Sequence, residues 1–170
     1  MRCLETGKEY EEVTIALAYD RAREVTQLFN EYIKSIIVED PEVIACLSAQ
    51  HYEDEFLELG IKYGLPYGRL YLACIKDQIA GCVALRQLEE GCCEIKRLYV
   101  RPSFRGMRIG KRLVEQILTD ARGIGYKHVR LDTFPFMKNA IVMYKEYGFY
   151  EISSYNDNPA SNAVFMQLDL

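Results

Sequence analysis

The sequence predicts one α+β domain over residues 1–170: a twisted, mostly antiparallel central sheet of about seven strands, flanked by about four helices. Seven short runs show the apolar or alternating patterns of strands. Three of these runs, between residues 69 and 100, are separated only by short turns, which is typical of an antiparallel meander. A strand, loop, helix and strand then follow, and this crossover predicts that strands 92–100 and 127–133 form a parallel pair.

The first half of the chain supplies a strand, two helices and the meander. Residues 13–19 alternate apolar with smaller or polar side chains, as in a half-buried strand. Asp20 is a candidate N-cap for a helix through about Ser35, and a second helix is expected over 47–60, ended by Gly60. The three meander strands are expected at 69–76, 79–88 and 92–100.

The second half completes the sheet. Leu113, Val114, Ile117, Leu118 and Ala121 recur at helical spacing, and glycines at 123 and 125 end this helix. The remaining elements are expected to be a strand ending near 133, a short helix over 138–147 and two last strands at 150–155 and 163–170.

Composition excludes several classes of protein. The chain is 49% hydrophobic, yet no apolar run approaches the ~20 residues of a membrane span. The first residues also lack the apolar centre of a secretory signal, so we expect a cytoplasmic protein without a membrane partner. The six cysteines form no C-x-x-C pair and there are only two histidines, so no metal site is expected and the cysteines are expected to be reduced.

Charge is distributed unevenly along the chain. The formal net charge is −4, but seven of the 21 basic residues fall between Lys96 and Arg112, a window without Asp or Glu. The overall acidity and the lack of a nucleic-acid motif argue against a nucleic-acid partner. A small polyanion suits this compact basic window better.

The window includes a glycine-containing loop that joins a strand to a helix. Backbone N–H groups at the start of a helix have no internal partners and can bind a phosphate. Gly106 and Gly110 would let phosphate oxygens approach the backbone, while Arg105, Arg108, Lys111 and Arg112 add positive charge. The loop is one residue too short for a P-loop and has no G-x-G-x-x-G, so neither of those phosphate motifs applies.

The segment "RGMRIG" resembles the Q/R-x-x-G-x-G/A signature of the GNAT superfamily of acetyl-CoA-dependent N-acetyltransferases, with Arg108 where a glycine is usual. "EIKRLYVRP" and "NAIVMYKEYGF" resemble two further segments of this family, and the order of strands matches from about residue 12 onward. The resemblance implies that acetyl-CoA is the cosubstrate and that a bulge splays the fourth strand from the fifth. It implies that backbone of the fourth strand and of the loop, with Asn139, binds the cofactor: Leu98, Tyr99, Val100, Arg105, Gly106, Met107, Arg108, Ile109, Gly110 and Lys111.

The resemblance also implies roles in catalysis. Tyr144 matches the family's general acid, which protonates the departing thiolate, although it could equally be a packing residue. Glu94 and Asp132 match positions where family members carry a general base, and Glu94 is preferred narrowly. Asn139 could alternatively be only a helix N-cap.

The implied function is transfer of an acetyl group from acetyl-CoA to a primary amine of a small molecule or peptide, by direct attack in a ternary complex. A non-catalytic acyl-CoA sensor or interaction domain of the same fold is the alternative. Four acidic residues, Glu53, Asp54, Glu55 and Glu58, are expected on a helix beside the acceptor entrance, which favours a cationic amine. A homodimer is possible, as is common among such enzymes.

Overall fold

A computed structural model describes residues 12–49, 52–55, 57–158 and 160–170, with only the backbone of Cys46, Ala49, Tyr52 and Glu53. The strands are β1 (Val13–Leu17), β2 (Arg69–Ile75), β3 (Gln78–Glu89), β4 (Cys92–Val100), β5 (His128–Thr133), β6 (Tyr150–Ile152) and β7 (Val164–Asp169). The α-helices are α1 (Ala22–Glu39), α2 (Val43–Ala49), α3 (Tyr52–Glu55), α4 (Leu59–Lys62), α5 (Ile109–Ile124) and α6 (Lys138–Glu146), and a 3₁₀ turn spans Pro102–Phe104.

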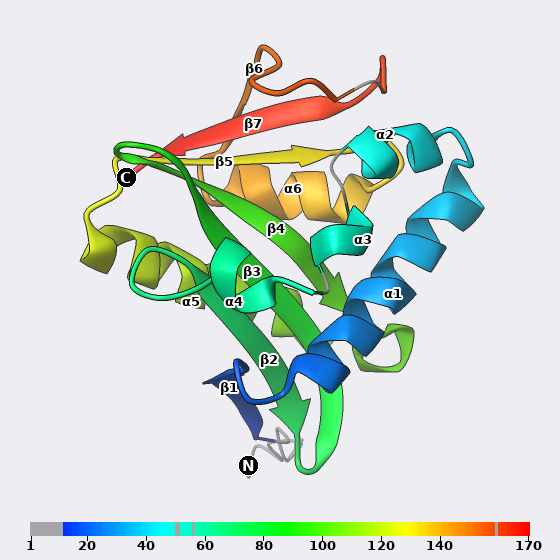
Figure 1. Ribbon diagram of the computed structural model, residues 1–170, viewed down its shortest axis with the longest axis vertical. Helices are drawn as coiled ribbons and strands as arrows, with labels where there is room; N and C mark the ends of the chain where they lie inside the picture. Colours follow the sequence, from blue (N-terminus) through cyan, green and yellow to red (C-terminus); the bar gives the residue numbers. More distant parts are fainter. Residues whose placement is uncertain (1–11, 50–51, 56, 159) are drawn as a thin grey trace, which may run out of the picture.

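The seven strands form one sheet in the order β1-β2-β3-β4-β5-β7-β6. All neighbouring strands run antiparallel except β4 and β5, which pair in parallel as the sequence predicts. Helices α1 to α4 lie in front of the sheet in the view of Figure 1, and α5 lies behind it. The predicted fold class is therefore confirmed.

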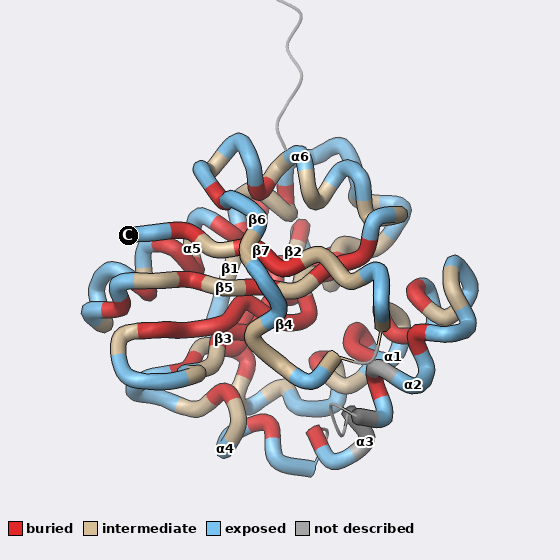
Figure 2. Tube along the Cα trace, turned by 90° about the horizontal axis from the view of Figure 1, so that it is seen from above, coloured by how far each residue is buried: buried red, intermediate tan, exposed pale blue. Residues whose placement is uncertain are grey.

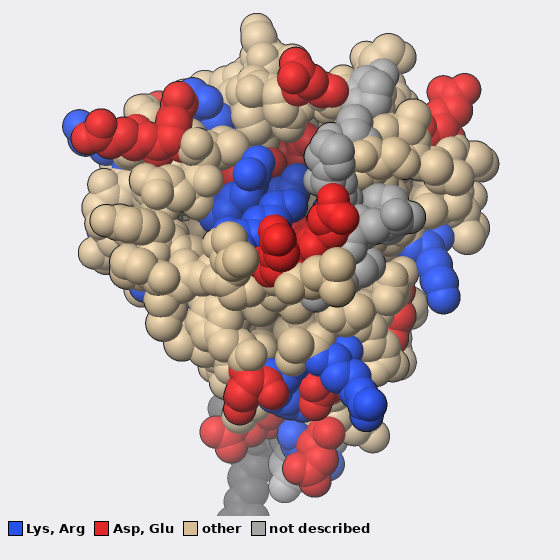
Figure 3. Space-filling model, in the orientation of Figure 1, with Lys and Arg blue, Asp and Glu red and all other residues tan. Residues whose placement is uncertain are grey.

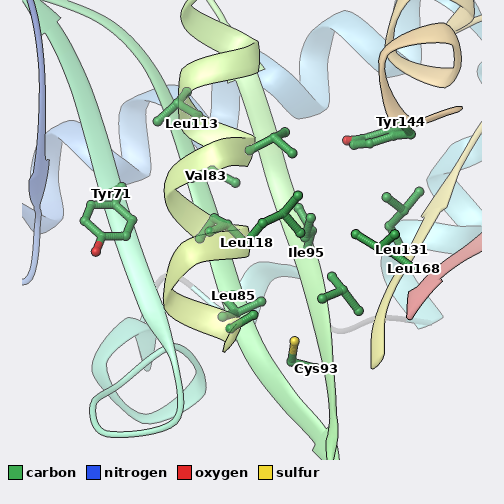
Figure 4. Packing of buried hydrophobic residues seen from close by; sticks show 14 of the residues in the cluster. Tyr71, Val83, Leu85, Cys93, Ile95, Leu113, Leu118, Leu131, Tyr144 and Leu168 are labelled. Atoms are coloured by element: carbon green, nitrogen blue, oxygen red, sulfur yellow. The ribbon is translucent and has the colours of Figure 1, made fainter. Parts of the chain in front are cut away.

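Alternation along the strands sends side chains to two separate hydrophobic clusters. On β2, Leu70 and Leu72 pack with Phe29 of α1, whereas Tyr71 and Ala73 belong to the cluster that contains α5. Figure 4 shows the second cluster between α5 and the strands, and Figure 2 shows the buried residues concentrated on the central strands. The sheet is thus covered by helices on both faces.

The helix expected over 47–60 is the main error in the predicted elements. The described residues of this region form three short helices, α2, α3 and α4, because its apolar pairs serve different clusters. Val43 and Leu47 cluster with Ile36 of the C-terminal half of α1. Leu59 clusters with Val25 and Phe29 of its N-terminal half. One straight helix could not bury both sets.

The start of α1 also differs from the prediction. Its N-cap is Arg21 rather than Asp20, without a side-chain cap hydrogen bond, and the helix continues to Glu39 rather than Ser35. Among the described helices, none combines the length and the apolar character needed to cross a membrane.

Two glycines provide a matched test of this packing. A Cβ at Gly81 of β3 would lie 2.6 Å from the backbone oxygen of Tyr99 on β4, whereas a Cβ at Gly123 of α5 would meet no heavy atom within 4 Å. We expect Gly81→Ala to lower the free energy of unfolding by roughly 1–3 kcal/mol through overpacking. Gly123→Ala should raise it by about 0.4–1 kcal/mol, since alanine narrows the unfolded ensemble.

Urea denaturation of the two variants checks this prediction. Equal stability of Gly81→Ala and the wild type would mean that β3 and β4 do not approach as closely as the structure has them.

Candidate active site

The site is built on the divergence of β4 from β5. Their parallel pairing covers only Cys92 to Glu94, opposite His128 to Arg130, and Figure 1 shows the two strands separating beyond it. On its other side β4 remains paired with β3 as far as Val100. Backbone of β4 after Glu94 is therefore left on the β5 side for a ligand to pair with.

A β-bulge lies in the diverging part of β4. Cys82 of β3 pairs with Tyr99 and Ala84 with Lys96, so Val83 alone faces the two residues between them, Arg97 and Leu98. Arg97 has a φ of 56°, in the left-handed region that residues with a Cβ rarely adopt.

A buried ion pair holds the Arg97 side chain. Its Nε donates a hydrogen bond to Oε2 of Glu55 on α3 at 2.9 Å, and its Nη2 lies 2.8 Å from the same oxygen without hydrogen-bond alignment. Lys62 Nζ approaches the other Glu55 oxygen at 3.3 Å. Burial opposes the charge on Arg97, but attraction by the Glu55 carboxylate outweighs it and raises the pKa of the guanidinium.

This pair corrects the expected role of the acidic segment 53–58. Glu55 is only 2% exposed and is neutralised by two cations, so it is not part of a solvated acidic face. Asp54 and Glu58 are exposed, and the side chain of Glu53 lies outside the described part of the structure. Glu55 therefore cannot contribute to the solvent-exposed negative charge that was expected to attract a cationic acceptor.

A cavity of about 50 Å³ lies where β4 and β5 separate. Typical ligand pockets hold about 300–1,000 Å³, so this volume suits only the inner end of a binding site, where reacting groups meet. Its lining residues come from α1, β4, β5 and α6: Tyr32, Ile95, Lys96, Arg97, Leu98, Leu131, Asp132, Thr133, Met137, Ala140 and Tyr144. Tyr144, Asp132 and Leu98 are thus the predicted site residues that line it.

Tyr144 of α6 is 6% exposed. Figure 4 shows its phenol directed from α6 toward β4, and its ring packs on Phe149 with centroids 5.5 Å apart. Burial raises the pKa of Tyr144, and the nearby Tyr32 and Asp132 raise it further. The hydroxyl therefore keeps its proton at neutral pH, as a proton donor must.

Asp132 of β5 is half-buried and held by a loop. The amide groups of Asn156 and Asn158 donate to its Oδ2 at 3.2 and 3.3 Å. Both asparagines lie between β6 and β7, and nothing in their sequence pattern indicates the aspartate that they orient. Their role becomes visible only in the folded protein, where β7 pairs with β5 and the loop before β7 lies beside Asp132.

Glu94 has a different environment. It is fully buried and is not among the residues that line the cavity. Arg86 contacts its Oε2 through Nε at 2.9 Å and Nη2 at 2.8 Å. Tyr155 donates to its Oε1 at 3.2 Å, and Lys96 Nζ lies 3.5 Å from the same oxygen. Burial, followed by the charges of Glu94 and Asp132, raises the pKa of Tyr155.

The loop after β4 has the geometry of an anion site. Gly106 has a φ of 83° and Arg108, at the N-cap of α5, has a φ of 61°, so Arg108 adopts the left-handed conformation that suits the usual glycine. The first intrahelical hydrogen bond of α5 is donated by Arg112 to the Arg108 carbonyl. The amides of Ile109, Gly110 and Lys111 therefore have no partner within the helix.

The cations of this loop have distinct environments. The guanidinium of Arg105 donates to the Val100 carbonyl at 3.1 Å, and Lys111 pairs with Glu146 of α6 at 2.6 Å. Arg112 donates to the Val13 carbonyl, so its charge serves packing rather than the loop. Arg105, Met107 and Arg108 are exposed.

Ile109 and Asn139, two of the residues predicted to bind the cofactor, do not present side chains to the cavity. Ile109 is 1% exposed and packs in the core, so only its backbone can face a ligand. Asn139 is exposed in the first turn of α6, and Met137, not Asn139, is the N-cap. Asn139 does not line the cavity.

The described cysteines and other metal-ligating side chains are dispersed through the fold. Among the described residues, no group of three or more His, Cys, Asp or Glu side chains is placed to hold a metal ion. Cys74, Cys82, Cys92 and Cys93 are free thiols, and burial raises the pKa of the last three.

Comparisons with known proteins agree with this geometry. An uncharacterized N-acetyltransferase of Schizosaccharomyces pombe is 39% identical over 126 residues, 73% of this chain and 77% of that protein. One from Dictyostelium discoideum is 30% identical over 93% of this chain and 99% of that protein. The PaiA N-acetyltransferase of Thermoplasma acidophilum, solved in complex with coenzyme A, has a TM-score of 0.74 at 18% identity, covering 94% of this chain and 99% of that one.

The acetyltransferase (GNAT) family itself matches residues 30–149. That span holds the diverging strands, the glycine-containing loop, Asp132 and Tyr144. The chain belongs to the acetyltransferase (GNAT) family.

Proposed function

We propose that this protein transfers the acetyl group of acetyl-CoA to a primary amine of a small molecule or peptide, by direct attack in a ternary complex. The observation that carries the proposal is that Tyr144 and Asp132 line one cavity at the point where β4 and β5 separate. A binding-only sensor has no need of a proton donor and a proton acceptor in the same cavity. Coenzyme A in the related Thermoplasma structure supports the choice of cosubstrate.

The cofactor is proposed to bind along β4 and the following loop. The amides of the first turn of α5, with Arg105, Arg108 and Lys111, would receive its pyrophosphate. The pantetheine arm would pair with backbone of Leu98 to Val100 on the side that β5 leaves open. A guanidinium at Arg108 can bind a phosphate through two N–H groups, which compensates for the missing glycine.

The chemistry needs two proton transfers. Asp132 takes a proton from the acceptor's ammonium group, because only the free amine has a lone pair to attack the thioester carbon. As the carbon–sulfur bond breaks, Tyr144 gives its proton to the sulfur. The tyrosine then regains a proton released by the nitrogen as the amide forms.

The surroundings of the two candidate bases support Asp132 over Glu94. Glu94 is enclosed by Arg86, Lys96 and Tyr155, whereas Asp132 borders the cavity. A carboxylate locked between two cations is a poor proton acceptor, because taking a proton would break those contacts. We therefore propose Asp132 as the base and Glu94 as the residue that holds Lys96 and Tyr155 in position.

The cofactor site is tested by Gly110→Val. A Cβ at Gly110 would lie 3.8 Å from Val100 Cγ2 and 4.0 Å from Met143 Sδ, which are ordinary contacts, so the fold should tolerate it. The added methyl groups would enter the space between β4 and α6 and should weaken CoA binding by at least about 100-fold, the loss of two charge-assisted hydrogen bonds. Calorimetry with CoA measures this, with Gly123→Ala on the same helix as control. Undiminished affinity would remove the loop from the site.

The acid is tested by Tyr144→Phe. Loss of the hydroxyl should lower kcat by roughly 10²–10⁴-fold, the usual contribution of a positioned acid, and leave CoA affinity unchanged. Tyr147→Phe is the matched control, because that hydroxyl bonds Glu115 outside the cavity. Release of CoA thiol gives the rate. Wild-type turnover by Tyr144→Phe, with chemistry rate-limiting, would return this tyrosine to a packing role.

The base is tested by the pH dependence of kcat/KM. Activity should fall toward low pH as the base takes up a proton, and Asp132→Asn should abolish this acidic limb of the profile. Glu94→Gln should keep the limb even where its rate or stability is reduced. The reverse pattern, a limb lost with Glu94→Gln and kept with Asp132→Asn, would make Glu94 the base.

A further inference from the structure

Three cations lie at or next to the cavity: Lys96 and Arg97 of β4, which line it, and Lys62 of α4, here together called the basic cluster. Lys96 and Arg97 line the cavity directly and are 7% and 6% exposed. Lys62 joins them through Glu55, which it shares with Arg97. Figure 3 shows Lys and Arg atoms gathered in a hollow on this face of the molecule, with Asp and Glu atoms beside them.

The basic cluster carries more charge than the described carboxylates around it neutralise. Glu55 is shared by Lys62 and Arg97, and Glu94 by Lys96 and Arg86. With Asp132 on the opposite side, three carboxylates face four cations in the described part of the chain. Cations in so buried a position are stable only when their charge is compensated.

Two further observations concern the charge and the hydrogen bonding of this cluster. Burial lowers the pKa of Lys62, and repulsion by Lys96 and Arg97 lowers it further against the attraction of Glu55. Within the described residues, Nη2 of Arg97 is buried yet donates no aligned hydrogen bond. The same nitrogen lies 2.8 Å from Glu55 Oε2, and Oε1 of Glu55 also lacks an aligned partner, so the ion pair leaves hydrogen-bonding capacity on both of its sides.

The cofactor's phosphates are an unsuitable source of that acceptor. Their proposed site is the loop at Arg105 to Lys111, beyond the far end of β4. From Lys96 to Val100 the strand extends roughly 13 Å, at about 3.3 Å per residue. The basic cluster instead borders the part of the cavity shared with Tyr144 and Asp132, where the acceptor amine would react.

We propose that the acceptor is an amino acid-like molecule, whose carboxylate is bound by the basic cluster while its amino group faces Asp132. The proposal rests on the proposed acetyltransferase function and names its substrate class. The carboxylate adds negative charge beside Lys96 and Arg97, which line the cavity, and offers an aligned acceptor to Arg97 Nη2. Asp132 receives the ammonium group, so both charges of a zwitterion meet opposite charges in one cavity.

This inference adds a carboxylate to the cationic amine expected from the sequence. The acidic segment 53–58 favours a cationic amine only while its carboxylates face solvent. Because Glu55 is neutralised inside the molecule, the charges that border the cavity itself decide the preference.

The first experiment compares matched acceptors. A panel of amino acids, each with its carboxamide and its decarboxylated amine, is assayed with acetyl-CoA for thiol release. The best acceptor should be an acid whose kcat/KM exceeds that of its neutral amide by roughly 10–100-fold, chiefly through KM, as for a charge-assisted hydrogen-bonded contact. A best substrate without an anionic group, or an amide as good as its acid, would overturn the inference and leave the acetyltransferase function standing.

Charge variants locate the effect. Lys96→Gln should reduce the preference for the acid over the amide to within about 3-fold and leave CoA affinity unchanged, because it removes one charged contact. If Lys96→Gln does not fold, Lys62→Gln is used instead, because the Lys62 side chain is 23% exposed and its replacement disturbs the core less. Lys145→Gln removes the same charge from an exposed site on α6 and should keep the full preference. A preference unaltered in both cluster variants would contradict the proposal.

A binding measurement separates this proposal from the enzymatic one. The thermal shift of the CoA complex is recorded with each acid and its amide. Larger stabilisation by the acids, lost in Lys96→Gln, supports the carboxylate site even if no amine is acetylated, and only the proposed function then fails. Equal stabilisation by acid and amide overturns the carboxylate site whatever the turnover.

Discussion

The separation of β4 from β5 after Glu94 shapes both the cavity and the surface open to a cofactor. Parallel pairing for only three residues leaves β4 backbone open for a cofactor and creates the cavity where α6 presents Tyr144. The bulge at Arg97 turns β4 away, at a cost of about 1–2 kcal/mol for a left-handed residue with a Cβ. The ion pair with Glu55 keeps that residue in place, because breaking it would leave a charge buried and unpaired.

Glu55 therefore affects both the shape of β4 and the charge beside the cavity. It lies on α3 and contacts Arg97 of β4, the strand proposed to bind the cofactor. Its carboxylate fixes the Arg97 side chain but balances only part of the charge of Lys62 and Arg97. The same arrangement that shapes the diverging strand thus gives the cavity a positive side, opposite the negative side formed by Asp132.

The two ends of the open β4 backbone suit different parts of one cosubstrate. At Val100 the chain enters a loop whose left-handed residues, Gly106 and Arg108, direct it into α5, so that unpartnered amides collect beside exposed arginines. At Lys96 the strand borders the cavity that Tyr144 and Asp132, the proposed proton donor and acceptor, also line. A rigid strand of fixed rise holds the anion site and the reactive cavity at a constant separation, which suits a cofactor with a phosphate end and a thioester end.

Secondary-structure elements that depend on patterns of neighbouring residues could be predicted from the sequence. The alternation of 13–19, the meander of 69–100, the helical spacing from Leu113 to Ala121 and the motif around Arg105 to Gly110 predict the sheet, its parallel pair and the anion loop. Tertiary contacts account for the division of 47–60 into short helices, for the burial of Glu55, and for the contrast between Asp132, which lines the cavity, and the enclosed Glu94. Each of these depends on residues far apart in sequence, since Glu55 meets Arg97 and Asp132 meets Asn156 only after the sheet has formed. Local periodicity reports which face of an element is apolar, whereas the charge state and the role of a carboxylate depend on the partners that folding brings to it.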